Sequence, residues 1–150
     1  MIIEVNSAKL GPLKVESDRL ITFPDGIPGF PNVKRYFVVE NGQGHPFCWL
    51  QAVEDPELAF VVTDPMIFNP SYQPPVPLEE FKRLEIDGGE SLALLVIVSV
   101  PQEDPLKMTA NFMAPLVINA KNRLGKQVIL HDSKYGHREP LLTAAASGRP

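Results

Sequence analysis

Residues 23–31 restrict the possible folds of this chain more than any other segment, because they contain three prolines and two glycines among nine positions. Proline fixes φ and has no backbone N–H, whereas glycine readily adopts positive φ, so neither a helix nor a central strand can pass through. The segment therefore predicts a turn-rich loop. It also carries Phe23, Ile27 and Phe30. Two interpretations follow: the apolar side chains fold back over a small core, which is favoured, or the loop is a rigid docking edge.

The remaining prolines are spread along the chain, which is typical of short strands separated by turns. There are 16 prolines among 150 residues, a length that fits one domain. Candidate strands are residues 1–5, 19–23, 35–40, 47–53, 59–63, 92–100, 116–119 and 127–131. Several of them are rich in aromatic and β-branched residues, which pack well on a pleated sheet. These short strands predict a mainly β domain, either a barrel or a sandwich.

One helix is expected at residues 78–84. Pro77 precedes it, Leu78, Phe81 and Leu84 recur on one side, and acids precede bases along it, as the helix dipole favours. Such a helix would plug one mouth of a barrel or cover a sheet edge. Beyond Arg138, small residues without periodicity predict a weak helical turn followed by disorder.

Charge is distributed unevenly along the chain. Residues 1–53 have no net charge, residues 54–104 carry eleven acids and two bases, and residues 105–150 have a net charge of +5. An acidic patch is the expected complement of a basic partner, because opposite potentials raise the rate of encounter. The acidic middle also argues against direct binding of nucleic acid, which requires lysine and arginine to neutralise phosphates.

The sequence contains few groups from which a catalytic or metal site could be built. Cys48 is the single cysteine, so it excludes an intrachain disulfide and a cysteine zinc cluster. The histidines, His45, His131 and His137, lie in no nucleophile, metal or phosphate motif. Ser133, His131 and Asp132 are too close in sequence to converge as a triad if they lie on a strand. We therefore expect neither an enzyme nor a cofactor.

The expected location is the cytoplasm. The longest strongly apolar run, residues 92–98, is far shorter than the roughly 20 residues that span a bilayer. The amino terminus has an acid in its short apolar stretch and lacks a basic start, so it does not resemble a secretory signal. Nothing in the sequence demands more than a monomer.

Several segments, taken in order, resemble the FliW family of bacterial flagellar assembly factors. After the loop at 23–31 these are residues 46–52, 58–65, Phe68-Asn69-Pro70, Tyr72, 109–119 and 123–130. The resemblance covers residues 1–138, whereas residues 139–150 form a tail that matches nothing assignable. It implies a small β-barrel-like single domain with one or two short helices and no enzymatic activity. It further implies two alternating partners: CsrA, a basic RNA-binding dimer that represses flagellin translation, and flagellin itself.

The contact surface is open to more than one interpretation. An exposed Phe112 and Met113 beside Asn111 would make an adaptable apolar anchor, although Phe112 in the core is equally compatible with the sequence. Residues 64–72 form either a lid or a docking loop, and acids would supply a charged rim. The expected partner-binding residues are Glu54, Glu57, Asp64, Phe68, Tyr72, Glu79, Glu80, Asn111, Phe112 and Met113.

Two rival functions remain at this point. One is a small-molecule-binding or hydrolytic β-barrel with a pocket near His45, Trp49 and His131, which a deep closed cavity would favour. The other is a plain flagellin chaperone without a regulatory partner. A shallow, exposed apolar groove would favour a protein binder instead.

Overall fold

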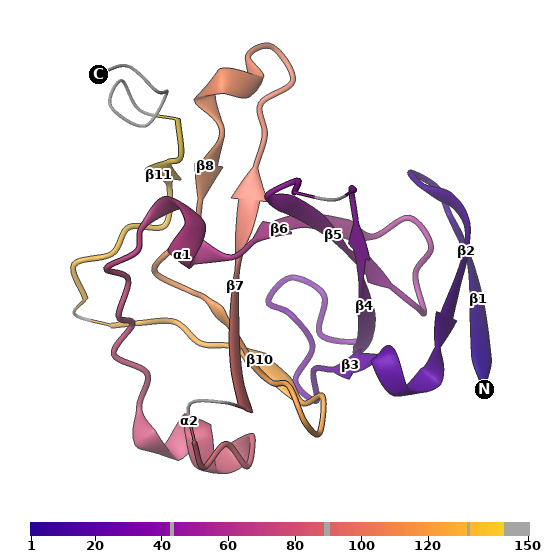
Figure 1. Cartoon of the computed structure of the whole chain (residues 1–150), viewed down its shortest axis with the longest axis horizontal. Helices are drawn as coiled ribbons and strands as arrows, with labels where there is room; N and C mark the ends of the chain where they lie inside the picture. The colour runs from indigo at the N-terminus through magenta and orange to yellow at the C-terminus, as the bar shows by residue number, and fades with distance from the viewer. Residues whose placement is uncertain (43, 89–90, 132, 143–150) are drawn as a thin grey trace.

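Seven strands follow one another in a single antiparallel path that curls until its ends meet (Figure 1). The computed structural model describes residues 1–42, 44–88, 91–131 and 133–142. The path runs β10-β9-β7-β6-β5-β4-β3. Its strands are β3 (Ile21–Thr22), β4 (Arg35–Glu40), β5 (Phe47–Ala52), β6 (Ala59–Thr63), β7 (Leu92–Ser99), β9 (Leu116–Asn119) and β10 (Gly125–Gln127).

The curled sheet closes through one narrow contact. An odd number of alternating strands leaves the first and last strands parallel, and the bridge between Thr22 and Leu124 is parallel. The Thr22 N–H donates to the Arg123 carbonyl at 2.8 Å. A side chain at Gly125 would meet the Phe23 ring at 2.8 Å, so glycine permits the two ends to approach. The expectation of a mainly β, barrel-like fold is confirmed.

Residues 23–34, the plug loop, fall within the outline of the strand ring in the view of Figure 1, and their buried positions are Phe23, Gly26 and Ile27. Phe23 and Ile27 are 0% and 1% exposed, and Phe23 packs edge-on against Tyr36 with ring centroids 5.5 Å apart. Leu50, Val62 and Leu116 complete this inner core. The loop therefore folds back over a core as predicted, and the docking-edge interpretation is wrong for Phe23 and Ile27.

Strand β7 is apolar on both faces because it separates two cores. Leu92, Leu94, Val96 and Val98 belong to a second core around Tyr72, whereas Ala93, Leu95 and Ile97 belong to the inner core. Side chains alternate across a strand, so a strand covered on both faces needs an unbroken apolar run. This explains the run at residues 92–98.

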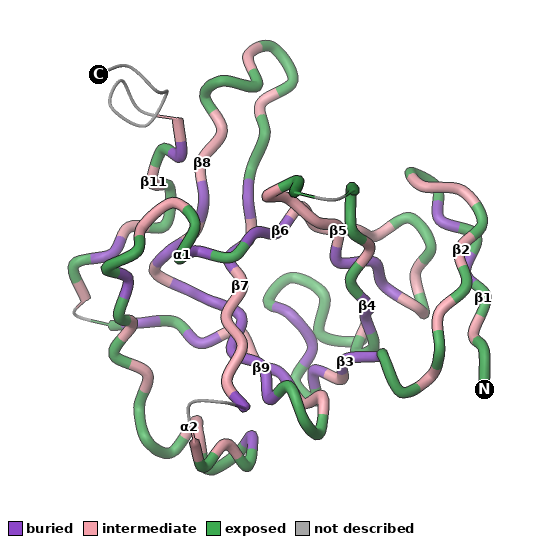
Figure 2. Tube along the Cα trace, viewed as in Figure 1, coloured by how far each residue is buried: buried purple, intermediate pink, exposed green. Residues whose placement is uncertain are grey.

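The amino-terminal hairpin forms its own two-stranded sheet against the outside of the barrel (Figures 1 and 2). It consists of β1 (Ile2–Ser7) and β2 (Gly11–Glu16). Val5 packs with Phe37, which points outward from β4 while its neighbour Tyr36 points inward. The sequence did not predict β2, which begins at Gly11 and Pro12, two residue types that are rare inside strands.

Several boundaries differ from those expected. Residues 35–40, 59–63 and 116–119 are strands as predicted, but the strand expected at 127–131 is wrong, since β10 ends at Gln127. The short strands β8 (Thr109–Ala110) and β11 (Glu139–Pro140) were missed, as was helix α1 (Pro65–Phe68) within the expected turn. Two-residue strands have too little periodicity to be recognised. Short 3₁₀ turns lie at Ser17–Arg19 and Pro105–Lys107.

Helix α2 (Leu78–Arg83) confirms the helix predicted at residues 78–84, and it ends one residue earlier than expected. After Arg138 the chain pairs β11 with β8 and buries Leu141. Most of the run from residue 141 to 150, where a weak helical turn was expected, lies outside the described residues. The expected disorder falls on residues 143–150, outside the described part of the chain. In that described part, no helix is both long and apolar enough to cross a membrane.

We predict that Gly26→Ala destabilises the protein by about 2 to 5 kcal/mol. Gly26 has φ of 69°, and a Cβ there would lie 2.7 Å from the Phe30 carbonyl oxygen, so backbone strain and a clash add together. Gly29→Ala is the matched control, because Gly29 also has positive φ but open space around it. Urea unfolding should show a clearly larger loss for Gly26→Ala; equal losses would contradict the clash.

Candidate protein-binding groove

Pro65 ends the pairing of β6 with β7. The register joins Val61 to Val98 and Thr63 to Val96 in antiparallel order, so the next hydrogen-bonded position, Pro65, would face Leu94. Proline has no N–H for that ladder and instead suits the first turn of a helix. Asp64 caps α1, with its Oδ1 accepting from the Met66 N–H at 2.9 Å. The chain therefore turns away from β7 at this point.

The departure of β6 leaves one edge of β7 open at Leu92–Leu95. The other edge is occupied, because Leu92–Leu95 pair with β9 in antiparallel register. The Ala120 N–H donates to the Ser91 carbonyl and the Asn111 N–H to the Ile97 carbonyl. Odd-numbered residues of β7 thus direct their backbone groups toward β9 and β8, and even-numbered ones toward β6. Within the described residues, the N–H and C=O of Leu94 have no hydrogen-bond partner.

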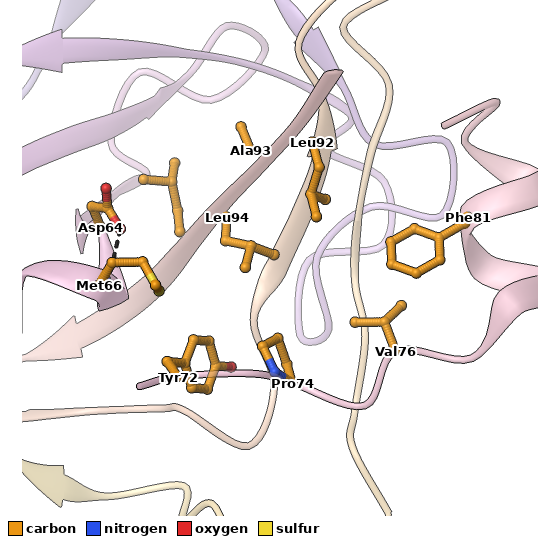
Figure 3. Close-up of a pocket in the computed structure, with 10 residues that line it drawn as sticks. Asp64, Met66, Tyr72, Pro74, Val76, Phe81, Leu92, Ala93 and Leu94 are labelled. Carbon is orange, nitrogen blue, oxygen red and sulfur yellow. Dashed lines mark hydrogen bonds between the residues drawn. The ribbon is translucent and has the colours of Figure 1, made fainter. Parts of the chain in front are cut away.

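An apolar groove of about 640 Å³ runs along this open edge (Figure 3). Leu92–Leu95 form its floor. The wall comes from the chain that follows β6 and from α2, through Asp64, Met66, Tyr72, Pro74, Val76 and Phe81. Ring and aliphatic side chains from that wall face the β7 leucines across the hollow in Figure 3.

The groove continues past α2 into a second hollow of about 330 Å³, which shares Phe81 and Leu92 with the first. Ile86, Asp87 and Leu78 line this extension. Leu78 is 67% exposed, and Met66 and Ile67 on α1 are 42% and 55% exposed. Apolar side chains are therefore presented to solvent along both ends of one surface, which we call the docking groove. Exposed apolar surface of this kind marks interaction sites.

Tyr72 fixes the wall of the docking groove. Its hydroxyl donates to the Phe112 carbonyl at 2.7 Å, and its ring contacts Tyr135 and Phe112 edge-on, with centroids 4.6 and 5.2 Å away. The Tyr135 hydroxyl accepts from the Gln73 N–H at 2.9 Å. The pKa of Tyr72 is raised, chiefly by burial and further by electrostatic interaction with Tyr135 and Glu139. The hydroxyl therefore stays protonated and able to donate.

Helix α2 is held in place from two sides. The Asn119 amide, buried at the end of β9, donates to the carbonyls of Leu84 and Glu85 at 2.9 and 3.1 Å. Glu80 pairs with Lys126 of β10 at 2.9 Å, and both side chains are mostly buried. Buried polar side chains with satisfied partners have few alternative positions, so these contacts hold α2 in place. Phe81 belongs to α2 and is therefore held at the groove.

The structure brings most of the expected partner-binding residues to one side of the molecule. Asp64 and Tyr72 line the docking groove, and Phe68 lies beside it in the second core, with its ring stacked on Phe47. Glu79 is exposed on α2, whereas the Glu80 carboxylate forms an ion pair with Lys126.

Three expected residues lie beneath the groove wall instead of on its surface. Phe112 is 2% exposed and packs under Tyr72, so the exposed anchor expected there is wrong and its place in the core is confirmed. Asn111 extends the pairing of β8 with β7 through its backbone. Met113 is partly buried against the same core.

Glu54 and Glu57 lie apart from the docking groove, in the turn between β5 and β6. Glu54 accepts from the side chain and backbone N–H of Arg35 and from the Lys34 N–H. Burial alone would raise its pKa, but these hydrogen bonds and the charge of Arg35 outweigh it, so the pKa of Glu54 is lowered. The neighbouring Pro56 carbonyl accepts from Ala8 of the amino-terminal hairpin.

The geometry offers contact surface more than reactive groups. Among the described residues, no three His, Cys, Asp or Glu side chains are placed to hold a metal ion. His45, Trp49 and His131, the suggested pocket of the rival function, do not line the docking groove. His45 instead bonds the backbone of Phe47, and Trp49 donates to Asn41 at 3.1 Å.

Met66 lies in the segment expected to be a lid or docking loop, but sequence reasoning missed the other groove-forming residues: Pro74, Val76, Phe81 and Leu92–Leu95. Their apolar character is visible in the sequence, but strand and helix patterns assign it to a core. The one usable signal was Pro65 directly after β6, since a proline there must end the pairing of a central strand.

Fold and groove together define a small, mainly β, barrel-like protein with an apolar groove beside an open strand edge. A crystal structure of the flagellar assembly factor FliW has this fold, with a TM-score of 0.86, 33% sequence identity, and coverage of 93% of this chain and 97% of the other.

Sequence comparisons agree with the structural match. The FliW family profile matches residues 4–141. The flagellar assembly factor FliW of Natranaerobius thermophilus is 38% identical over 139 residues, covering 93% of this chain and 92% of the relative. That of Alkaliphilus metalliredigens is 43% identical, covering 88% and 82%. The chain belongs to the FliW family.

We predict that Tyr72→Phe lowers the free energy of unfolding by about 1 to 3 kcal/mol, because the buried Phe112 carbonyl loses its donor. Tyr36→Phe is the matched control. The Tyr36 hydroxyl is buried, and no partner for it lies in the described residues, so its removal should be neutral or stabilising. Thermal and urea unfolding check both, and an equal loss in the two variants would contradict the role of the Tyr72 hydroxyl.

We predict that Glu54 stabilises the protein at neutral pH and loses this effect in acid. Its folded pKa is lowered from 4.5, so its contribution is present above about pH 4.5 and disappears as pH falls through the lowered value. The stability difference between the parent and Glu54→Gln should therefore shrink below that pH in urea titrations. Glu57→Gln is the control, and a difference independent of pH would exclude the Glu54 carboxylate as its cause.

Proposed function

We propose that this chain is a flagellar assembly factor that works in the cytoplasm by binding other proteins. It binds the translational regulator CsrA and thereby relieves repression of flagellin translation, and it binds flagellin in alternation with CsrA. The action requires neither catalysis nor a cofactor, and the acting unit is a monomer that does not itself contact nucleic acid or membrane. Residues 1–138 form the family domain in this proposal, with residues 139–150 as its tail.

The observation that supports this function best is the docking groove in a chain of this family. Its relatives are named flagellar assembly factors, and an assembly factor acts through contact with other proteins. The groove is apolar, continuous and open along a strand edge, as expected for recognition of a polypeptide. Its wall is fixed by Tyr72 and Asn119 before any partner arrives, which lowers the entropy cost of binding.

Charge supports a basic partner such as CsrA. Asp64 and Asp87 are the charged side chains among those lining the two hollows, and both are exposed acids. Glu79 adds a further exposed acid on α2. Acids around an apolar surface attract a basic protein and orient its approach.

We predict that the protein forms a complex with CsrA in gel filtration at low salt, and that added salt weakens this complex because rim charges are screened. Glu79→Lys should slow association more than it accelerates dissociation. Surface plasmon resonance separates the two rates.

Glu4→Lys is the matched control. It changes the net charge by the same amount as Glu79→Lys, but Glu4 is exposed on β1, away from α2 (Figure 1). Unchanged association for Glu79→Lys would exclude α2 from the interface. Failure to co-elute with CsrA at low salt would reject the regulatory function. Retention of flagellin without CsrA would then identify a plain flagellin chaperone.

A further inference from the structure

The open edge of β7 is a hydrogen-bonding surface inside an apolar groove. Leu94 directs its N–H and C=O toward the side that β6 vacates, and no other described residue bonds them. Leu92 lies two residues away on the same edge. Unpaired backbone groups at a strand edge are a template for another strand.

We propose that a partner protein binds by adding an extended segment alongside β7 at Leu92–Leu94, in the place that β6 leaves at Pro65. The inference rests on the proposed function, because it assigns the mode of binding to the groove used there. It goes beyond that function by naming the recognised conformation and the backbone atoms that recognise it.

An extended segment fits this site better than a helix. A helix satisfies its own backbone groups and would leave those of Leu94 unpaired, whereas a strand bonds them directly. The adjacent groove supplies the second half of this recognition mode. Side chains of a strand alternate, so every second side chain of the segment faces the hollow between Leu92, Leu94, Val76 and Phe81.

The lining of the groove also specifies the composition of the segment. The hollow is bounded by leucine, valine and phenylalanine, so the inserted side chains are apolar. Asp64 lies at one end of the groove and Asp87 in its extension past α2. A segment with apolar residues at alternate positions and a lysine or arginine at its ends complements both features.

Leu94→Pro tests the backbone contact. Proline removes the N–H that faces the open edge but no bond to β9, because Leu94 belongs to a pair that does not exchange hydrogen bonds with β9. Leu94→Val is the matched control, since it shortens the side chain and keeps the N–H. We expect the complex with CsrA or flagellin to be about tenfold weaker for Leu94→Pro than for Leu94→Val. Circular dichroism and urea unfolding establish that both variants fold.

A second measurement avoids substitution altogether. Hydrogen exchange of the Leu94 amide in the parent protein should slow at least about tenfold when the partner is bound, because the new hydrogen bond must open first. The Ala93 amide, directed toward β9, should change much less. Equal affinity of the two variants together with an unprotected Leu94 amide would overturn strand addition, even if the complex with CsrA forms and the proposed function holds.

A synthetic peptide tests the edge independently of either natural partner. The probe is an acetylated and amidated seven-residue peptide with Val and Thr in alternation and Lys at both ends. Shifts of the Leu92 and Leu94 amides in a nuclear magnetic resonance titration, absent in Leu94→Pro, support the inference even if CsrA and flagellin fail to bind. The absence of shifts, together with no bound natural partner, overturns it. A dimer of the free protein that Leu94→Pro dissociates would identify a second copy as the occupant and also overturn it.

Discussion

The architecture depends on a single strand that is buried on both faces. Leu92, Leu94, Val96 and Val98 of β7 close one core, while Ala93, Leu95 and Ile97 close the other. Because burial of apolar surface is the main stabilising force, β7 contributes to the stability of both cores. Phe23 and Ile27 of the plug loop belong to the inner core, and the chain around Tyr72, between α1 and α2, covers the second core. The docking groove arises where β6 no longer accompanies β7, so the site follows from the same strand that holds the cores together.

Rigid polar contacts give the groove its shape. Tyr72 ties the chain between α1 and α2 to the Phe112 carbonyl, Asn119 ties the end of α2 to β9, and Lys126 holds Glu80. Each contact is at least partly buried, where hydrogen bonds and ion pairs are less screened by water. An apolar surface would normally collapse or be covered, and these contacts keep its two walls apart. A groove fixed in this way needs little rearrangement to receive another molecule.

Much of the fold could be predicted from sequence, since strong periodicity and breakers are local signals. Residues 35–40 and 59–63 were predicted as strands because β-branched and aromatic residues cluster there, and α2 because its leucines, Phe81 and charges follow helical spacing. Strand β2 was missed because Gly11 and Pro12 begin it, and β11 because two residues carry no pattern. The site was harder. Asp64 and Tyr72, which line the groove, were expected. The backbone groups of Leu94 face the open edge because of its pairing with β9, and no property of a leucine in the sequence reveals that direction.

The closure of the barrel has a mechanical consequence. A ring of seven antiparallel strands cannot close with an antiparallel pair, and here the remaining junction consists of the short bridge between Thr22 and Leu124. Every other junction on the ring is a ladder of two or more residue pairs. Because this bridge has the fewest paired residues on the ring, we expect it to open first under thermal motion. Phe23 packs against Gly125 beside this bridge, so an opening there would expose the Phe23 side chain to water before the rest of the inner core.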